Sequence, residues 1–276
     1  AALTALPDNL DMSQGKYFIS AFNGCSSLTT IGNGVLLGTA NATATVNFTS
    51  AFNGCTNLTA LPAGLDMSQG SAFNSAFESC TSLATIGTGV LLGTANTTAT
   101  VDFSSVFRST AITELPAGLD MSQGDSFEAA FYDCGSLATI GTGVLLGTAN
   151  ATATVNFDYS FYNTALTELP ANLDLSKGSD FIGAFQDCSS LATIGTGVLL
   201  GTASSSVNFT SAFSGCTNLT TLPANLNLSQ GDDFNTMFYY CSSLVTFPAG
   251  AFDTMGTPAA YCFYYAWVGC TSLSGA

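Results

Sequence analysis

The sequence contains no histidine and few charges of either sign. Only 8% of its 276 residues are charged, against about 25% in a typical soluble protein. Without an imidazole base, nucleophilic Ser–His and Cys–His pairs cannot form. The basic residues are Lys16, Arg108 and Lys177; against 18 acids they leave a net charge of −15. This balance argues against nucleic acid and anionic membranes as partners, because neutralising phosphates requires lysine and arginine.

Long apolar runs are also missing. The longest, such as Val35–Leu37, are far shorter than the roughly 20 residues that a membrane-spanning helix needs. We therefore expect no membrane insertion. We expect solubility to come from threonine, serine, asparagine and the dispersed acids.

What the sequence does have is one apolar frame that repeats along the chain. In residues 58–80 the frame reads Leu-x-x-Leu-x-x-x-Leu and then, eight residues on, Phe-x-x-x-Phe-x-x-Cys. The period predicts a solenoid of ten turns, each called a coil below, that alternate between about 30 and about 25 residues. The second aromatic residue of the frame falls at Phe22, Phe52, Phe77, Phe107, Phe131, Phe161, Phe185, Phe213, Phe238 and Trp267.

The frame predicts the same local structure in every coil. The segment Leu58–Leu61 and its counterparts predict a short strand that ends at a proline or glycine, as at Pro62. Phe73, Phe77 and Cys80 are spaced i, i+4, i+7, which predicts one face of a short helix. Because one such coil cannot bury its own apolar face, we expect the coils to stack into an α/β repeat solenoid.

The frame is similar to the leucine-rich repeats of BspA-like surface proteins in two stretches. These are Leu65–Ser68, which reads Leu-Asp-Met-Ser, and Ala76–Leu83, which reads Ala-Phe-Glu-Ser-Cys-Thr-Ser-Leu. The resemblance covers nearly the whole chain. It departs in the long coils, which carry an added Leu-Leu-Gly-Thr-Ala-Asn segment, and at Phe73, where the family often has methionine. The resemblance implies a curved leucine-rich-repeat solenoid that is extracellular, on a cell or virion surface, and serves adhesion or binding without catalytic residues.

Eight of the nine cysteines share one position of the repeat, which is occupied by Thr110 and Thr164 in two coils. Cys134 lies between these coils, so at about 4.8 Å per coil its nearest counterparts would be roughly 9 to 10 Å away. A disulfide fails beyond about 7 Å between Cα atoms, and a metal site needs several convergent ligands. We therefore predict no cofactor and a structural row of buried thiols: Cys25, Cys55, Cys80, Cys134, Cys188, Cys216, Cys241 and Cys270.

Acidic residues leave two other possibilities open. Acids within residues 125–133 and at 232–233 could form the carboxylate pair of a sugar-cleaving enzyme, with about 5 to 9.5 Å between the two groups. They fall at the ends of the predicted helix, where solvated residues are expected, so we predict no enzyme. A second set recurs in every second coil and either bonds backbone amides two residues on or forms a calcium ladder: Asp11, Asp66, Asp120, Asp174 and Asn227.

Solvent-facing positions of the predicted strands form a stripe of mostly small, neutral, threonine-rich residues. The stripe lacks the tryptophan, tyrosine and arginine anchors that are typical of strong protein interfaces, which favours a glycan or a packed neighbour. The candidate binding stripe consists of Thr30, Thr59, Thr85, Thr113, Glu114, Thr139, Thr167, Glu168, Thr193 and Thr220.

The two ends of the sequence suggest a second interaction surface. Residues 1–241 carry the regular leucine-rich repeat, whereas residues 242–276 form a degenerate, aromatic-rich terminal repeat. Because Thr271–Leu273 occupy the same repeat position as Ala1–Leu3, copies could stack head to tail into a fibre. Alternatively, the aromatic cluster is a cap and the N-terminus was trimmed from a larger protein. The candidate assembly interface consists of Ala1, Leu3, Leu6, Tyr261, Phe263, Tyr264, Tyr265, Trp267 and Leu273.

Two functional hypotheses follow from the sequence. In the first, the chain is a non-enzymatic, extracellular structural or adhesive solenoid whose partner is another copy of itself. In the second, it is a module of a larger surface adhesin whose partner is a host protein or glycan.

Overall fold

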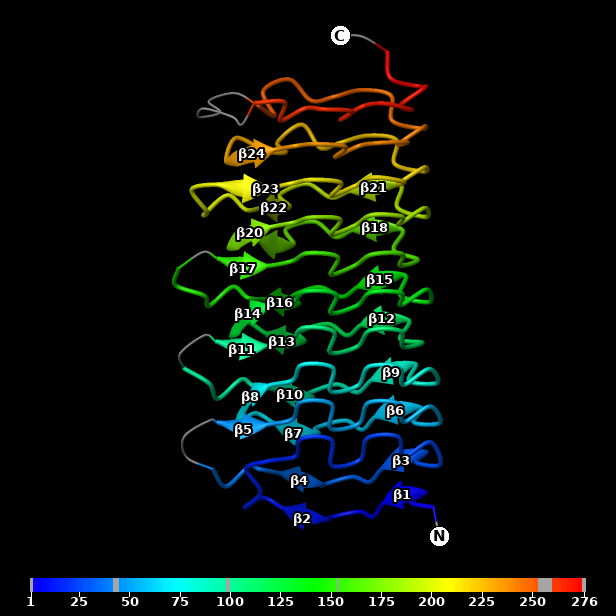
Figure 1. The fold of residues 1–276 in the computed structure, drawn as a ribbon, viewed down its shortest axis with the longest axis vertical. Coiled ribbons are helices and arrows are strands. Elements are labelled where there is room, and N and C mark those ends of the chain that lie inside the picture. The colour runs from blue at the N-terminus through cyan, green and yellow to red at the C-terminus, as the bar shows by residue number, and fades with distance from the viewer. Residues whose placement is uncertain (1, 42–44, 98–99, 153, 253–259, 275–276) are drawn as a thin grey trace.

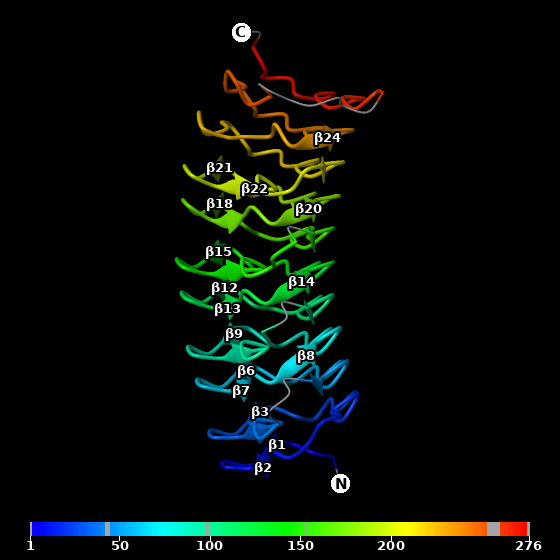
Figure 2. The same cartoon turned by 90° about the vertical axis from the view of Figure 1, so that its left-hand side faces the viewer.

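The chain forms a long rod with its two termini at opposite ends (Figures 1 and 2). The structure is a computed structural model and describes residues 2–41, 45–97, 100–152, 154–252 and 260–274. It is a parallel β-solenoid of about nine coils, so the solenoid prediction is confirmed and the count of ten is not.

Each regular coil carries up to three short strands, and strands in the same place of successive coils form a face of the rod (Figure 1). The first strand face comprises β1 (Ala5–Leu6), β3 (Thr30–Ile31), β6 (Ala60–Leu61), β9 (Thr85–Ile86), β12 (Glu114–Leu115), β15 (Thr139–Ile140), β18 (Glu168–Leu169) and β21 (Thr193–Ile194). The second comprises β2 (Asp11–Met12), β4 (Leu36–Leu37), β7 (Asp66–Met67), β10 (Leu91–Leu92), β13 (Asp120–Met121), β16 (Leu145–Leu146), β19 (Asp174–Leu175) and β22 (Leu199–Leu200). The third is one eight-stranded parallel sheet: β5 (Val46–Asn47), β8 (Gly70–Ala72), β11 (Val101–Asp102), β14 (Gly124–Ser126), β17 (Val155–Asn156), β20 (Gly178–Asp180), β23 (Val207–Asn208) and β24 (Gly231–Asp233).

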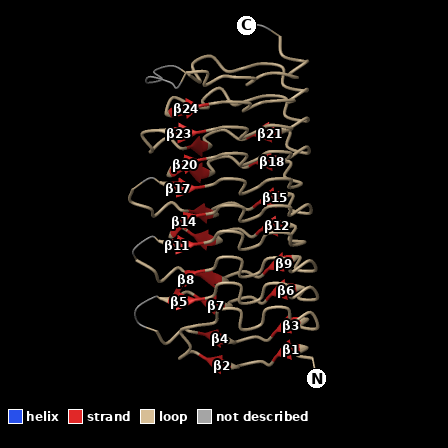
Figure 3. Ribbon diagram, in the orientation of Figure 1, coloured by secondary structure: helices blue, strands red, loops and turns tan. Residues whose placement is uncertain are grey.

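The predicted short helix is wrong, and with it the α/β class. Figure 3 shows strands and loops only, and none of the described residues is helical. The Phe-x-x-x-Phe-x-x-Cys segment instead makes successive β-turns. The N–H of Ala76 donates to the carbonyl of Phe73 at 2.8 Å, and that of Cys80 donates to Phe77 at 3.2 Å. Ser75 has φ 54°, the left-handed value that the third residue of a type II turn requires.

Hydrogen bonds between coils explain why β-turns form where the spacing predicts a helix. The N–H of Phe73 donates to Asp102 of the next coil at 2.7 Å, and that of Phe77 donates to Val106 at 2.8 Å. A helix would direct these N–H groups to carbonyls four residues back. Here they link neighbouring coils, and the two phenylalanines still point into the core. We call the surface built by these segments the β-turn face.

The core is a one-dimensional stack of apolar side chains. Two columns of phenylalanine run along the rod, and ring centroids of successive coils lie 4.8–5.8 Å apart. Each buried phenylalanine contributes about 1.5–3 kcal/mol relative to an exposed one. In the last coil Phe247 lies edge-on to Phe238 and Trp267, and Phe252 lies edge-on to Phe234 and Trp267, so the regular stacking changes there.

Proline divides the first strand face into pairs of coils. In long coils a glycine after the strand donates its N–H to the short coil before it, as from Gly87 to Leu61 at 2.9 Å. The short coil has proline at this position, such as Pro116 after β12, and proline has no N–H to donate. The sheet therefore breaks into two-stranded pieces, β1–β3, β6–β9, β12–β15 and β18–β21. At one break, between Gly141–Leu145 and Pro170–Asp174, lies a cavity of about 330 Å³.

Candidate functional site

The cysteine row lies along the β-turn face, on its inner side. All nine cysteines are free; Cys25 and Cys270 are half-buried and the rest are buried. Each thiol from Cys55 onward in the row donates to the second phenylalanine carbonyl of a coil before it, as from Cys134 Sγ to Phe107 at 3.0 Å. Burial raises the pKa of the Cys134 and Cys188 thiols to about 11, so both are protonated and poorly nucleophilic at neutral pH.

Threonine stands at this position where cysteine is absent, but its hydroxyl donates to a carbonyl of its own coil rather than of the coil before it. The hydroxyl of Thr110 donates to the carbonyl of Phe107 at 2.8 Å and lies 3.3 Å from the sulfur of Cys134. Thr164 bonds Phe161 and Cys188 in the same way. Each threonine hydroxyl therefore links its own coil to the cysteine of the next coil.

The candidate binding stripe lies on the first strand face, and all ten of its residues are exposed. Three of its hydroxyls are already bonded to the preceding coil. Those of Thr59, Thr167 and Thr220 donate to backbone carbonyls at 3.5, 3.5 and 3.3 Å, across the breaks that proline leaves in the sheet. These three threonines thus reinforce the weak interfaces between pairs. Ligand binding by the stripe stays a prediction.

The candidate assembly interface is split between the two ends of the rod. Leu3 is 40% exposed, whereas Leu6 is buried in the core, and Ala1 lies outside the described residues. At the other end Tyr261 is 86% exposed. Of the remaining predicted residues, Tyr264 and Tyr265 are exposed and Phe263, Trp267 and Leu273 are half-buried.

The recurrent aspartates stabilise corners of the coils. Each accepts the N–H of the serine two residues on, as Asp66 does from Ser68 at 2.9 Å, so the backbone interpretation of this set is confirmed. Among the residues that the structure describes, no group of three or more potential ligands could hold a metal ion. On the β-turn face, burial together with Asp180 and Glu128 raises the pKa of Asp158 to about 6.

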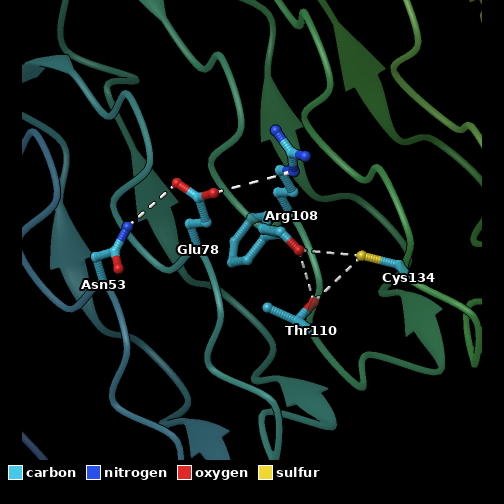
Figure 4. A network of polar contacts seen from close by, with 6 residues as sticks. Asn53, Glu78, Arg108, Thr110 and Cys134 are labelled. Carbon is cyan, nitrogen blue, oxygen red and sulfur yellow. Dashed lines mark hydrogen bonds and ion pairs between the residues drawn. The ribbon is translucent and has the colours of Figure 1, made fainter. Parts of the chain in front are cut away.

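A ladder of unlike side chains crosses the β-turn face at the position after the second phenylalanine. Asn53 Nδ2 donates to Glu78 Oε2 at 3.1 Å, and Glu78 Oε1 lies 3.9 Å from Arg108 Nε (Figure 4). The Arg108 guanidinium lies 4.6 Å from the ring centroid of Tyr132, a cation–π contact. Tyr132 in turn stacks on Tyr162 at 4.5 Å. The ladder therefore joins five successive coils.

Sequence reasoning missed this ladder, although a signal was present. Glu78 and Arg108, like Tyr132 and Tyr162, stand at the same repeat position in successive coils. Aligning the coils at this position would have predicted that the opposite charges of Glu78 and Arg108, and the rings of Tyr132 and Tyr162, lie side by side.

Beyond Tyr162 the β-turn face is hollowed by a groove of about 810 Å³, here called the notch. Its floor is Ser211, Ser214, Gly215 and Thr217, all in one coil. At two of these positions this coil has a small residue where the neighbouring coils have large ones: Ser214 aligns with Gln186 and Tyr239, and Gly215 aligns with Asp187 and Tyr240. The walls are Gln186, Asp187 and Asn163 on one side and Thr236, Tyr239 and Tyr240 on the other, with Ser189 also lining the groove.

Polar contacts hold the walls in place. A hydrogen bond from the Tyr162 hydroxyl to the Asp187 carboxylate raises the pKa of this tyrosine to about 12. Asn163 Nδ2 donates to Asp133 Oδ1 at 2.9 Å. On the opposite wall the rings of Tyr239 and Tyr240 meet edge to face, with centroids 4.4 Å apart. The notch is therefore preformed, with a carboxylate and amides facing two phenols.

No protein-family model and no curated protein matches the chain. Among solved structures, a leucine-rich cell surface protein from Faecalibacterium prausnitzii is 16% identical, with a TM-score of 0.39 over 93% of this chain and 67% of that one. A leucine-rich repeat protein of T. pallidum is 16% identical, with a TM-score of 0.33 over 79% of each chain. One from Bacteroides ovatus is 15% identical, with a TM-score of 0.24 over 82% of this chain and 80% of that one.

The solved structures to which the chain is similar are thus leucine-rich-repeat proteins. Separately, the described part of the chain has no helix of the length and apolarity needed to cross a membrane.

Proposed function

We propose that the chain is a non-enzymatic, extracellular adhesive solenoid that binds its ligand in the notch of the β-turn face. The observation that carries this proposal is the notch itself. Its walls stand on coils held together by inter-coil backbone bonds, so they present a fixed shape. Its volume of about 810 Å³ falls in the range of ligand-binding grooves, about 300–1,000 Å³.

Departure from the repeat supports a binding role for this face. The strand faces repeat the same few residue types from coil to coil, whereas the position after the second phenylalanine varies in size and charge. Tyr162, Gln186, Ser214 and Tyr239 occupy it in four successive coils. Packing of the core does not require the residue type at this position to vary from coil to coil. Recognition of a specific ligand does require different side chains at different places on the face.

A non-enzymatic role fits the chemistry of the described side chains. The recurrent aspartates are engaged in corner hydrogen bonds, and burial keeps thiols such as Cys134 and Cys188 protonated. The notch contains one carboxylate, that of Asp187, whereas glycoside cleavage requires a pair.

Filling the notch tests the proposal. Ser214→Tyr places a tyrosine where Tyr162 and Tyr239 stand in nearby coils, so the fold should accept it. The control is Asn23→Tyr, which introduces tyrosine at the same repeat position in the first coil, at an exposed residue outside the notch. We expect wild type and Asn23→Tyr to bind immobilised glycans, surface proteins or whole cells equally, and Ser214→Tyr to lose at least tenfold in affinity. Equal binding by all three proteins would show that the notch is not the ligand site.

A second candidate function, head-to-tail assembly, is favoured by the distribution of exposed apolar side chains. Half of the exposed large apolar side chains of the described residues lie in the end coils, and the two most exposed, Tyr17 at 78% and Tyr261 at 86%, are among them. The end-coil residues are Leu3, Tyr17 and Ile19 in the first coil and Tyr261, Tyr264, Tyr265 and Val268 in the last. If a second copy continued the register, Phe263 and Trp267 would lie against its Phe18 and Phe22. Stacked copies would then extend both phenylalanine columns.

Electron microscopy over a concentration series tests this second candidate. We expect fibres with a repeat near the rod length, about 45 Å at strand spacing. The double variant Tyr264→Ser with Trp267→Ser should abolish them, whereas Tyr159→Ser, at an exposed tyrosine in the middle of the rod, should not. Fibres that persist in the double variant would contradict stacking through this end.

A further inference from the structure

We infer that the ligand of the notch is a neutral glycan. This inference rests on the proposed binding function and names the chemical class that the notch selects. Four features carry it: aromatic surface on one wall, hydrogen-bonding groups on the other, hydroxyls on the floor, and the sign of the charge of the lining.

The aromatic wall offers ring surface to the apolar side of a sugar. Tyr240 is 54% exposed, and its edge-to-face contact with Tyr239 fixes the ring in place. A pyranose presents C–H groups on one face and hydroxyls around its edge. Packing the C–H face on an aromatic ring buries apolar area, while the phenol O–H stays free to bond.

The opposite wall offers donors and acceptors for sugar hydroxyls. Asp187 accepts the Tyr162 hydroxyl and keeps further lone pairs, since an ionised carboxylate has about four acceptor sites. The amide of Gln186 can both donate and accept. Gln186 and Asp187 on one wall and Tyr239 and Tyr240 on the other belong to the coils on either side of the floor coil. These two coils are about 10 Å apart at strand spacing. A sugar ring lying between the two walls can contact both.

The floor supplies hydroxyls that accept or donate as the ligand requires. Ser211 Oγ and Thr236 Oγ1 lie 2.7 Å apart, and either can be the donor. Ser214 is only 8% exposed and lies at the bottom of the groove. A hydroxyl-lined floor suits a polyhydroxylated ligand better than an apolar peptide side chain, because hydroxyl oxygens keep acceptor capacity that only a polar ligand can use.

The charge of the notch excludes acidic ligands. Its lining contains Asp187 and no lysine or arginine. Arg108 belongs to another coil, where it is engaged with Glu78 and Tyr132. A sialylated or sulfated sugar would bring a second negative charge next to Asp187 with no cation to neutralise it, on a chain of net charge −15.

The test uses a glycan array of neutral, amino-bearing and acidic oligosaccharides, followed by titration calorimetry with the strongest neutral hit. We expect hits among the neutral glycans. Tyr240→Ala and Asp187→Asn should each weaken the hit at least tenfold, and Ser214→Tyr should abolish it. Asn23→Tyr should bind as the wild type does. Near-ultraviolet circular dichroism of each variant checks that the fold is retained.

Each other outcome overturns the inference in a distinguishable way. Preferential binding of acidic or amino-bearing glycans would show that the notch does not select neutral sugars. Binding to proteins alone, lost in Ser214→Tyr, would overturn the glycan class and leave the proposed binding function standing. A neutral hit that survives Ser214→Tyr would place the glycan elsewhere on the rod.

Discussion

The N–H of Gly141 donates a hydrogen bond of 2.8 Å to the carbonyl oxygen of Leu115 in the preceding coil. This bond requires a close approach of the two backbones. A Cβ atom added to Gly141 would lie 2.5 Å from the nitrogen of Ala117, a distance that side chains do not tolerate. The glycine of each long coil thus allows the backbone of that coil to pack closely against the short coil before it.

Gly141→Ala should therefore destabilise the rod. The clash is with backbone, which cannot rotate away as a side chain can, so we expect a loss of about 1–3 kcal/mol in the free energy of unfolding. Gly135→Ala is the matched control, because no atom lies within 4 Å of its added Cβ. Urea denaturation followed by circular dichroism measures both. Equal stability of the two variants would contradict the tight pairing.

Backbone amides should exchange at different rates within and between pairs of coils. The N–H of Ala138 bonds Thr113 at 2.9 Å within a pair, whereas the N–H of Thr167 bonds Ala138 at 3.2 Å across a break made by Pro170. We expect the protection factor of Thr167 to be about tenfold lower, since local opening requires fewer bonds to break there. Hydrogen exchange followed by NMR tests this. Equal protection at the two sites would mean that proline does not weaken the interface.

The buried thiols should resist alkylation in the folded protein. Burial raises the pKa of Cys134 and Cys188 to about 11 and that of Cys241 to about 12, so little reactive thiolate forms at pH 8. The half-buried Cys25 and Cys270 should react first with iodoacetamide. Mass spectrometry of peptides locates the modified residues, and urea-unfolded protein, in which all nine cysteines should react, is the control. Rapid modification of Cys134 without urea would contradict the prediction that burial protects this thiol.

The stability of the rod should fall as the pH rises through the titration of Asp158. Its folded pKa is raised to about 6 from an unfolded value of 3.8, so the folded state binds more protons between these values. The free energy of unfolding must then decrease with pH in this window. Asp158→Asn should reduce that slope and still accept the N–H of Ile182, which bonds Asp158 Oδ1 at 2.8 Å.

Denaturation at pH 4, 5, 6 and 7 measures this slope. Glu168→Gln, which removes an exposed acid of the first strand face, is the control and should keep the wild-type slope. If Asp158→Asn keeps it as well, the pH dependence arises elsewhere.

The sequence predicted the elements that depend on the repeat alone. The segment Leu58–Leu61 was expected to be a strand, and β6 covers its last two residues, Ala60–Leu61. The predicted helix at 73–80 failed because an i, i+4, i+7 spacing buries the same side chains in a helix or in two β-turns. In the structure Ser75 has φ 54°, a left-handed value that no residue inside an α-helix takes.

The sequence by itself determined the period, and the period determined which residues become neighbours along the rod. Stacking of phenylalanines and the position of the cysteine row follow from that register, because each coil can bury its apolar side only against the next. Tertiary structure decided where the backbone N–H groups point, since bonds between coils compete with bonds inside a helix. It also decided the notch, because a hollow forms only where the small side chains of Ser214 and Gly215 meet the larger ones of adjoining coils.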